Sequence, residues 1–114
     1  MIHEEICTYE VAKLAKEKGF DVPTAKNYRH ENGATCNAPT QSLLQRWLRE
    51  EKGYAISVTA YPTLASLNKV CYAWEIKSSS DGAFMKSVDG EYTFSTYELA
   101  LEDALKYALE NLVI

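Results

Sequence analysis

The first side chains that could carry chemistry lie at the amino terminus, where several metal-binding residue types stand close together. They are His3, Glu4, Glu5 and Cys7. A structural zinc site takes about four such ligands, with a second ligand-bearing segment further along the chain. No comparable segment follows downstream. The cluster therefore indicates a polar stretch ahead of a helix, and no metal or other cofactor is expected.

A second candidate is a nucleophile and base formed by Cys36 and His30. Such a pair needs hydrogen-bond reach and a third group that orients the base. The chain has only two histidines, and it contains no Cys-x-x-Cys, no His-Glu-x-x-His and no glycine-rich phosphate loop. The sequence therefore favours a protein that is not an enzyme, and catalysis by this pair is the minor alternative.

Four carboxylates near the carboxyl terminus could hold a cation. They fall on the outer side of the last predicted helix, where charged groups are normally solvated. Glu102 precedes Lys106 by four residues, and an ion pair in this orientation stabilises a helix by about 0.2–0.5 kcal/mol. We expect a solvated face with no bound cation. The carboxylates are Glu98, Glu102, Asp103 and Glu110.

The composition predicts one globular domain in the cytosol. The chain has 114 residues, of which 46% are hydrophobic and 25% charged. The amino terminus has no secretory signal and no apolar run reaches membrane-spanning length, so three cysteines are expected as reduced thiols. A net charge of −4 argues against broad attraction to nucleic acid or anionic lipid.

Two of the predicted helices are each bounded by a capping residue and a glycine. Thr8 can cap a helix that runs to Lys18, after which Gly19 ends it. Thr40 can cap a second helix, which Gly53 ends. The apolar residues of both segments recur at helical spacing, so each helix has one side available for a core.

The last helix, predicted over 96–112, has the most strongly specified start. Ser95 and Glu98 stand in the Ser-x-x-Glu arrangement of a capping box. Phe94 and Leu99 are spaced to pack against each other across the helix entry. We therefore expect Ser95 to be the N-cap.

Strands are predicted where the hydrophobic period changes to two, over 54–61 and 70–77. A third strand is expected over 91–94, with 78–89 as an exposed loop. The alternative is a hairpin between 84–88 and 91–94.

These elements predict an α+β fold in a single domain, 1–114. Residues 40–114 form an α-β-β-β-α core, with two helices on one face of an antiparallel three-stranded sheet, or a four-stranded one if the alternative hairpin forms. Residues 1–39 add an N-terminal helix and either an irregular loop or a small hairpin between 26–30 and 34–37.

The helix–strand–strand–strand–helix order resembles the double-stranded RNA-binding domain in topology. That family places lysines at the start of its last helix to hold phosphates across the RNA groove. Here the position reads Ser95-Thr96-Tyr97-Glu98, and residues 96–112 carry four acidic residues against one lysine. The resemblance therefore implies a shared topology without the RNA-binding function.

Three segments resemble a family of small uncharacterised proteins from prophage and other mobile-element regions of gut bacteria. They are YEVAKLAKEKGF at 9–20, APTQSLLQRWLRE at 38–50 and TYELALE at 96–102. The middle segment is the most specific of these, and the resemblance covers nearly the whole chain. It implies a phage-related context, and it supplies no activity and no site.

The leading functional hypothesis is a small cytosolic accessory protein that binds a protein partner or itself. The second face of the sheet is small and mixed enough for contact, unless residues 21–39 fold over it. That face comprises Ala55, Ser57, Thr59, Tyr61, Cys71, Ala73, Glu75 and Lys77. The residues expected at the contact are Tyr28, Arg29, Tyr61, Glu75 and Lys77. The alternative is nucleic-acid binding through Lys26, Arg29, Arg46 and Arg49.

Overall fold

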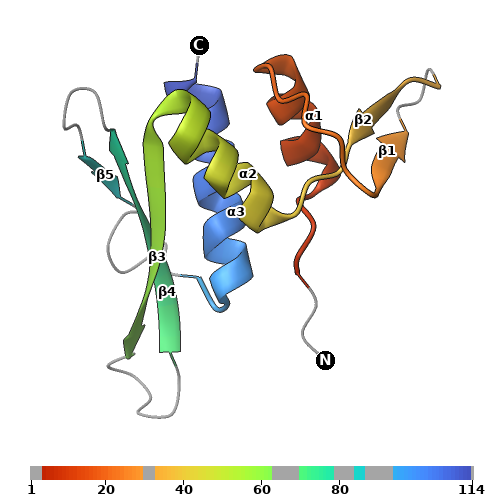
Figure 1. Cartoon of the computed structure of the whole chain (residues 1–114). Coiled ribbons are helices and arrows are strands. Elements are labelled where there is room, and N and C mark those ends of the chain that lie inside the picture. The colour runs from red at the N-terminus through yellow and green to blue at the C-terminus, as the bar shows by residue number, and fades with distance from the viewer. Residues whose placement is uncertain (1–3, 30–32, 63–69, 79–83, 87–93, 114) are drawn as a thin grey trace.

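The computed structural model describes residues 4–29, 33–62, 70–78, 84–86 and 94–113, without the side chains of 61, 62 and 84–86. Over these residues the fold is α+β, as the sequence predicts (Figure 1). The α-helices are α1 (Tyr9–Glu17), α2 (Gln41–Trp47) and α3 (Tyr97–Tyr107). A π-helical turn extends α2 (η1, Leu48–Lys52) and another extends α3 (η2, Ala108–Leu112). The strands are β1 (Asn27–Arg29), β2 (Thr35–Asn37), β3 (Tyr54–Pro62), β4 (Val70–Ser78) and β5 (Phe84–Lys86).

Both predicted ends of the first helix are confirmed. The Thr8 hydroxyl accepts a hydrogen bond from the Val11 amide at 3.3 Å, which satisfies one of the free donors of the first turn. At the other end Gly19 has φ +102°, a conformation that favours glycine. The chain then folds back, so that the Phe20 amide donates to the Ala15 carbonyl.

The second helix also begins and ends where the sequence predicts. The Thr40 hydroxyl accepts from the Leu43 amide at 3.2 Å, and Gly53 ends η1 at φ 79°. The helix widens into a π-helical turn before that glycine. Tyr54 follows directly, and its hydroxyl donates to the Leu112 carbonyl at 3.0 Å, which joins the start of β3 to the end of η2.

The predicted start of the last helix is wrong by one residue. The N-cap is Thr96, whose hydroxyl accepts from the Leu99 amide at 3.1 Å. Phe94 exchanges both backbone hydrogen bonds with Tyr72, so it stays in sheet conformation and the cap falls one position later than Ser95. Leu99, which the sequence pairs with Phe94 across the helix entry, is 53% exposed.

The small hairpin at the amino-terminal side is present. β1 and β2 pair antiparallel, with Tyr28 opposite Cys36. Residues 30–32, between the two strands, lie outside the described residues. The sequence left an irregular loop as the other interpretation.

The larger sheet is antiparallel, in the order β3-β4-β5. β3 and β4 pair without interruption from Tyr54 opposite Ser78 to Pro62 opposite Val70. Residues 84–86 pair with β4, so the interpretation of 78–89 as one exposed loop is wrong. The expected strand over 91–94 lies outside the described residues except for Phe94, which bridges to β4.

The hydrophobic core lies around α3, which contacts β3, β4, α2 and α1. Figure 1 shows the sheet on one side of α2 and α3, with α1 and the β1–β2 hairpin on the other. The sheet contributes side chains that alternate along its strands, as a half-buried sheet requires. No helix in the described part of the chain is long and apolar enough to cross a membrane. The largest fully buried hydrophobic side chains include Leu44, Leu48, Ile76, Leu105 and Leu109.

The corrected cap can be tested by comparing two neighbouring hydroxyl deletions. Thr96→Ala removes the acceptor for the Leu99 amide, so we expect the free energy of unfolding to fall by about 1 kcal/mol. Ser95→Ala removes no cap, and the expected change is below about 0.5 kcal/mol. Urea denaturation of both variants measures the difference. A larger loss for Ser95→Ala than for Thr96→Ala would contradict the assignment.

Candidate functional site

The second face of the larger sheet is exposed, and we call it the open face. In the described part of the chain it consists of Ala55, Ser57, Thr59, Cys71, Ala73, Glu75 and Lys77. The side chains of Ala55, Ser57, Thr59 and Lys77 are exposed, and the three others are half-buried. The helical segments that pack against β3 and β4 are α3 and η1, and they contact the core-facing side chains.

The segment 21–39, in its described part, does not cover the open face. Lys16 of α1 donates to the Thr35 carbonyl at 3.0 Å, and the Cys7 amide donates to the Pro39 carbonyl at 2.9 Å. These bonds hold the segment against α1 and the start of α2. Figure 1 shows β1 and β2 on the far side of α1 from β3 and β4. The predicted contact surface would disappear if residues 21–39 folded over it, and the described part of this segment does not.

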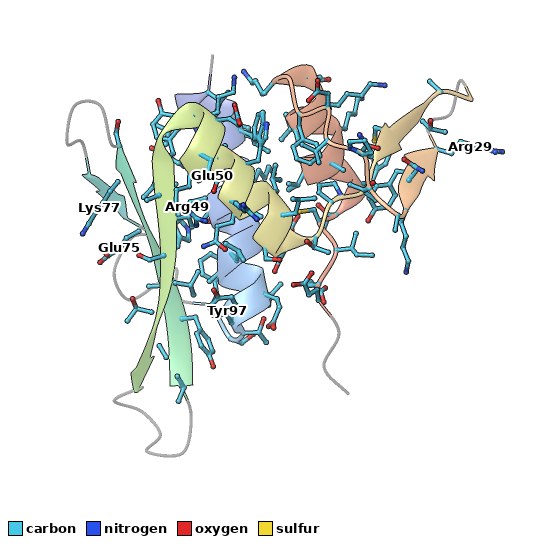
Figure 2. The ribbon with its side chains drawn as sticks, in the orientation of Figure 1. Arg29, Arg49, Glu50, Glu75, Lys77 and Tyr97 are labelled. Carbon is cyan, nitrogen blue, oxygen red and sulfur yellow. The ribbon has the colours of Figure 1, made fainter. Side chains whose placement is uncertain are left out.

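Small side chains occupy the centre of the open face and charged ones lie towards one end. Thr59 is opposite Ala73 and Ser57 is opposite Glu75 across the two strands. Figure 2 shows Glu75 and Lys77 on the side of the sheet that faces away from the helices. Of the predicted contact residues, the structure therefore brings Glu75 and Lys77 onto one surface. The side chain of residue 61 lies outside the described residues.

Tyr28, another predicted contact residue, has an internal role. Its hydroxyl donates to the Cys7 carbonyl at 2.6 Å, and its ring meets Tyr9 edge-on with the centroids 5.6 Å apart. Burial raises the pKa of the Tyr28 hydroxyl, and the nearby Cys7 and Glu102 raise it further. Tyr28 therefore fastens the β1–β2 hairpin to the amino-terminal end of α1.

The basic residues of the nucleic-acid alternative do not form one patch. Arg46 pairs with Glu50 at 3.1 Å on the outer side of α2 and η1. Arg29, a predicted contact residue in both hypotheses, lies on β1, far from Arg49 on η1 in Figure 2. A phosphate backbone needs cations that follow its path, and Arg29 and Arg49 lie on separate parts of the fold.

The candidate nucleophile Cys36 is buried, with 3% of its surface exposed, and it pairs across the hairpin with Tyr28. His30 and His3 lie outside the described residues. Cys7 is fully buried beside Glu102, and both burial and that carboxylate raise the pKa of its thiol. Within the described part of the chain, no group of three or more His, Cys, Asp or Glu could hold a metal ion.

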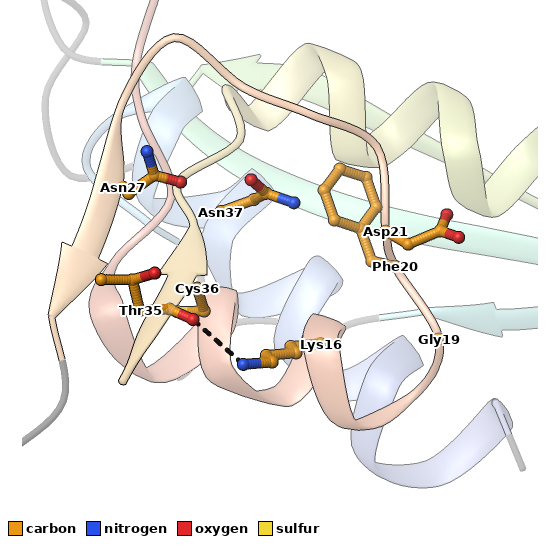
Figure 3. Close-up of a pocket in the computed structure, with 8 residues that line it drawn as sticks. All are labelled: Lys16, Gly19, Phe20, Asp21, Asn27, Thr35, Cys36 and Asn37. Carbon is orange, nitrogen blue, oxygen red and sulfur yellow. Dashed lines mark hydrogen bonds between the residues drawn. The ribbon is translucent and has the colours of Figure 1, made fainter. Parts of the chain in front are cut away.

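A hollow of about 460 Å³ lies between the end of α1 and the β1–β2 hairpin (Figure 3). Phe20 and Cys36 are its buried lining residues. Its polar lining mixes the ammonium of Lys16, the carboxylate of Asp21 and two asparagine amides. Because Lys16 already donates to the Thr35 carbonyl, its cation holds the hairpin to α1. The mixed lining defines no single class of ligand.

The polar group that sequence reasoning missed is the Glu102 carboxylate. Its Oε2 accepts from the Thr8 amide at 3.0 Å and from the Thr8 hydroxyl at 2.9 Å. Its Oε1 accepts from Gln41 Nε2 at 2.9 Å. Gln41 is only 4% exposed, and its second amide hydrogen goes to the Glu98 carbonyl. The carboxylate thus joins the start of α1 and the start of α2 to α3.

The prediction that Glu102 is a solvated outer-face residue paired with Lys106 is therefore wrong. Lys106 instead pairs with Glu10 of α1 at 2.9 Å, and with Glu110 at 3.8 Å. Asp103 is exposed, yet it accepts from Trp74 Nε1 at 2.8 Å. No local pattern could have revealed these contacts, since the partners of Glu102 lie 61 and 94 residues away in the chain.

No family model, curated protein or solved structure matches this chain in the comparisons with known proteins.

The role of Glu102 can be tested with an isosteric substitution. Glu102→Gln keeps the shape but puts an amide donor against Thr8 or Gln41, which are themselves donors. We expect the free energy of unfolding to fall by about 1–2 kcal/mol. Glu110→Gln, in the π-helical turn η2 that extends α3, is the matched control, with an expected change below about 0.5 kcal/mol. Equal effects in urea denaturation would show that the network contributes nothing specific.

The buried Cys7 thiol predicts a loss of stability at alkaline pH. Above the ordinary thiol pKa of 9.0, the unfolded chain releases this proton while the folded chain retains it, so unfolding becomes more favourable. One such group contributes at most about 1.4 kcal/mol per pH unit. Measured from about pH 8 to about pH 10, the stability of Cys7→Ala should fall less steeply than that of the unmodified chain. Parallel curves would contradict the assignment.

Proposed function

We propose that this protein is a small cytosolic accessory protein of a phage or other mobile element, which acts by binding a protein partner through the open face. The observation that carries the proposal is the exposure of that face after the rest of the described chain has packed elsewhere. The cytosolic and phage-related parts of the proposal rest on the sequence, through its composition and the resemblance of three segments.

The chemistry of the open face suits a protein partner better than a small molecule. It is the regular surface of two paired nine-residue strands, and small side chains at its centre let another backbone or flat surface approach. Glu75 and Lys77 provide one acid and one base, which can give a partner orientation at the edge of a contact. A small-molecule site would need a concave lining with convergent polar groups.

The proposal is tested by placing a charged side chain on the open face while leaving the fold intact. Ala55 is exposed and lies opposite Lys77, so Ala55→Glu adds an opposite-charge cross-strand pair. We expect the stability to change by less than about 0.5 kcal/mol. Partner capture from the host by the immobilised chain should fall by about tenfold or more.

The matched control is Ala25→Glu, since Ala25 is also exposed but lies in the loop between α1 and β1. This variant should capture the partner as the unmodified chain does. Equal capture by both variants, or capture of nothing specific by the unmodified chain, would overturn the open-face proposal.

A further inference from the structure

Among the described residues, the outer edge of β3 has no strand partner. β4 pairs with β3 on one side, and with β5 and Phe94 on the other. β3 has β4 as its only strand partner among the described residues. An unpaired edge presents backbone donors and acceptors that can pair with another strand.

The hydrogen-bond pattern shows which residues present those groups. Tyr72 exchanges its backbone bonds with Phe94, so its own groups point away from β3. Ala60 is opposite Tyr72 in the β3–β4 pair, so the backbone N–H and C=O groups of Ala60 must point away from β4. Because these directions alternate along an antiparallel strand, the backbone N–H and C=O groups of Ile56 and Val58 also point away from β4. Consistent with this, the Ile56 carbonyl accepts from Gln45 Nε2 at 2.8 Å, outside the sheet.

This edge lacks most of the devices that keep natural edge strands apart. Residues 54–62 contain no charged residue and no glycine, and the register with β4 runs without a bulge. Tyr, Ile, Val and Thr give the strand high β-propensity. Backbone pairing along this edge is blocked at two positions only. Pro62 lacks an amide hydrogen, and the Ile56 carbonyl already accepts from Gln45.

We propose that two copies of this chain pair along their β3 edges, antiparallel and about a two-fold axis through Thr59. Val58 of each copy then exchanges both backbone hydrogen bonds with Ala60 of the other. Ile56 falls opposite Pro62 of the second copy. Pro62 has no amide hydrogen for the Ile56 carbonyl, but Gln45 already donates to that carbonyl. Between these positions, no backbone donor or acceptor on the edge is left without a partner.

Other registers along the edge fit less well. A shift that places Val58 opposite itself sets Ala60 against the Ile56 carbonyl, which Gln45 already occupies. The opposite shift places Val58 against Pro62, which has no donor for the free Val58 carbonyl. The two local blocks are therefore complementary only when Thr59 lies opposite Thr59 of the second copy.

The side chains also favour a second copy as the occupant. Thr59 is exposed on the open face, and Thr–Thr cross-strand pairs are favourable. The uncharged strand brings no like charges into register, although each chain carries a net charge of −4. The paired β3 strands would make one continuous sheet with two open faces side by side. This inference adds self-association to the proposed function and does not depend on an outside partner.

The test uses opposite charges at the two-fold axis. Non-hydrogen-bonded partners lie about 4.5 Å apart between Cα atoms, so Thr59→Lys places two ammonium groups together and Thr59→Glu places two carboxylates together. Sedimentation equilibrium from about 10 µM to about 1 mM should show dimer for the unmodified chain and at least tenfold weaker association for each variant. An equimolar mixture of the two variants should regain dimer, because lysine then faces glutamate. Thr59→Val is the control and should dimerise.

An unmodified chain that stays monomeric at about 1 mM would overturn the inference. So would variants that dimerise like the unmodified chain, or a mixture that does not recover. Circular dichroism on each variant shows whether it is folded, and the recovery in the mixture cannot arise from unfolding. Ala55→Glu should leave this self-association unchanged, since residue 55 lies beyond the paired segment. Failure of the open-face proposal and failure of the self-association proposal can therefore be told apart.

Discussion

The carboxylate of Glu102 is the interaction on which the arrangement of the helices depends. In an ordinary capping box the helix supplies its own acid at the third position, which in α1 is occupied by Val11. Here α3 supplies it, while the same group binds the buried amide of Gln41 at the start of α2. One half-buried acid therefore accepts from donors at the starts of two helices. These directional bonds fix the orientation of α1 and the β1–β2 hairpin relative to α3, in addition to their packing.

The sequence predicted the features that depend on neighbours in the chain and missed those that depend on distant ones. Thr8, Gly19, Thr40 and Gly53 bound their helices as expected, because caps and glycine turns are local chemistry. The cap at Ser95 failed because a distant contact, the pairing of Phe94 with Tyr72, overrode an equally good local pattern. The open face was predictable from the alternation of small and large residues along two strands, but its exposure depended on where residues 21–39 packed.

The two sides of the sheet differ in how much they contribute to packing within the chain. Ile56, Trp74 and Ile76 are buried on the core side, so the hairpin is firmly attached to α3. The other side and the β3 edge contribute little to the fold of a single chain. The open face carries mostly small residues with one acid and one base, while the β-branched Ile56 and Val58 of β3 pack against the core.

The position of Glu102 along the chain also has a consequence for how the protein is made. Its bonds to Thr8 span 94 residues, so the first helix is synthesised well before its acid exists. A helix as short as α1 is marginal by itself in water. The amino-terminal layer therefore cannot complete these contacts until α3 has been synthesised, so this part of the fold does not form progressively from the amino end.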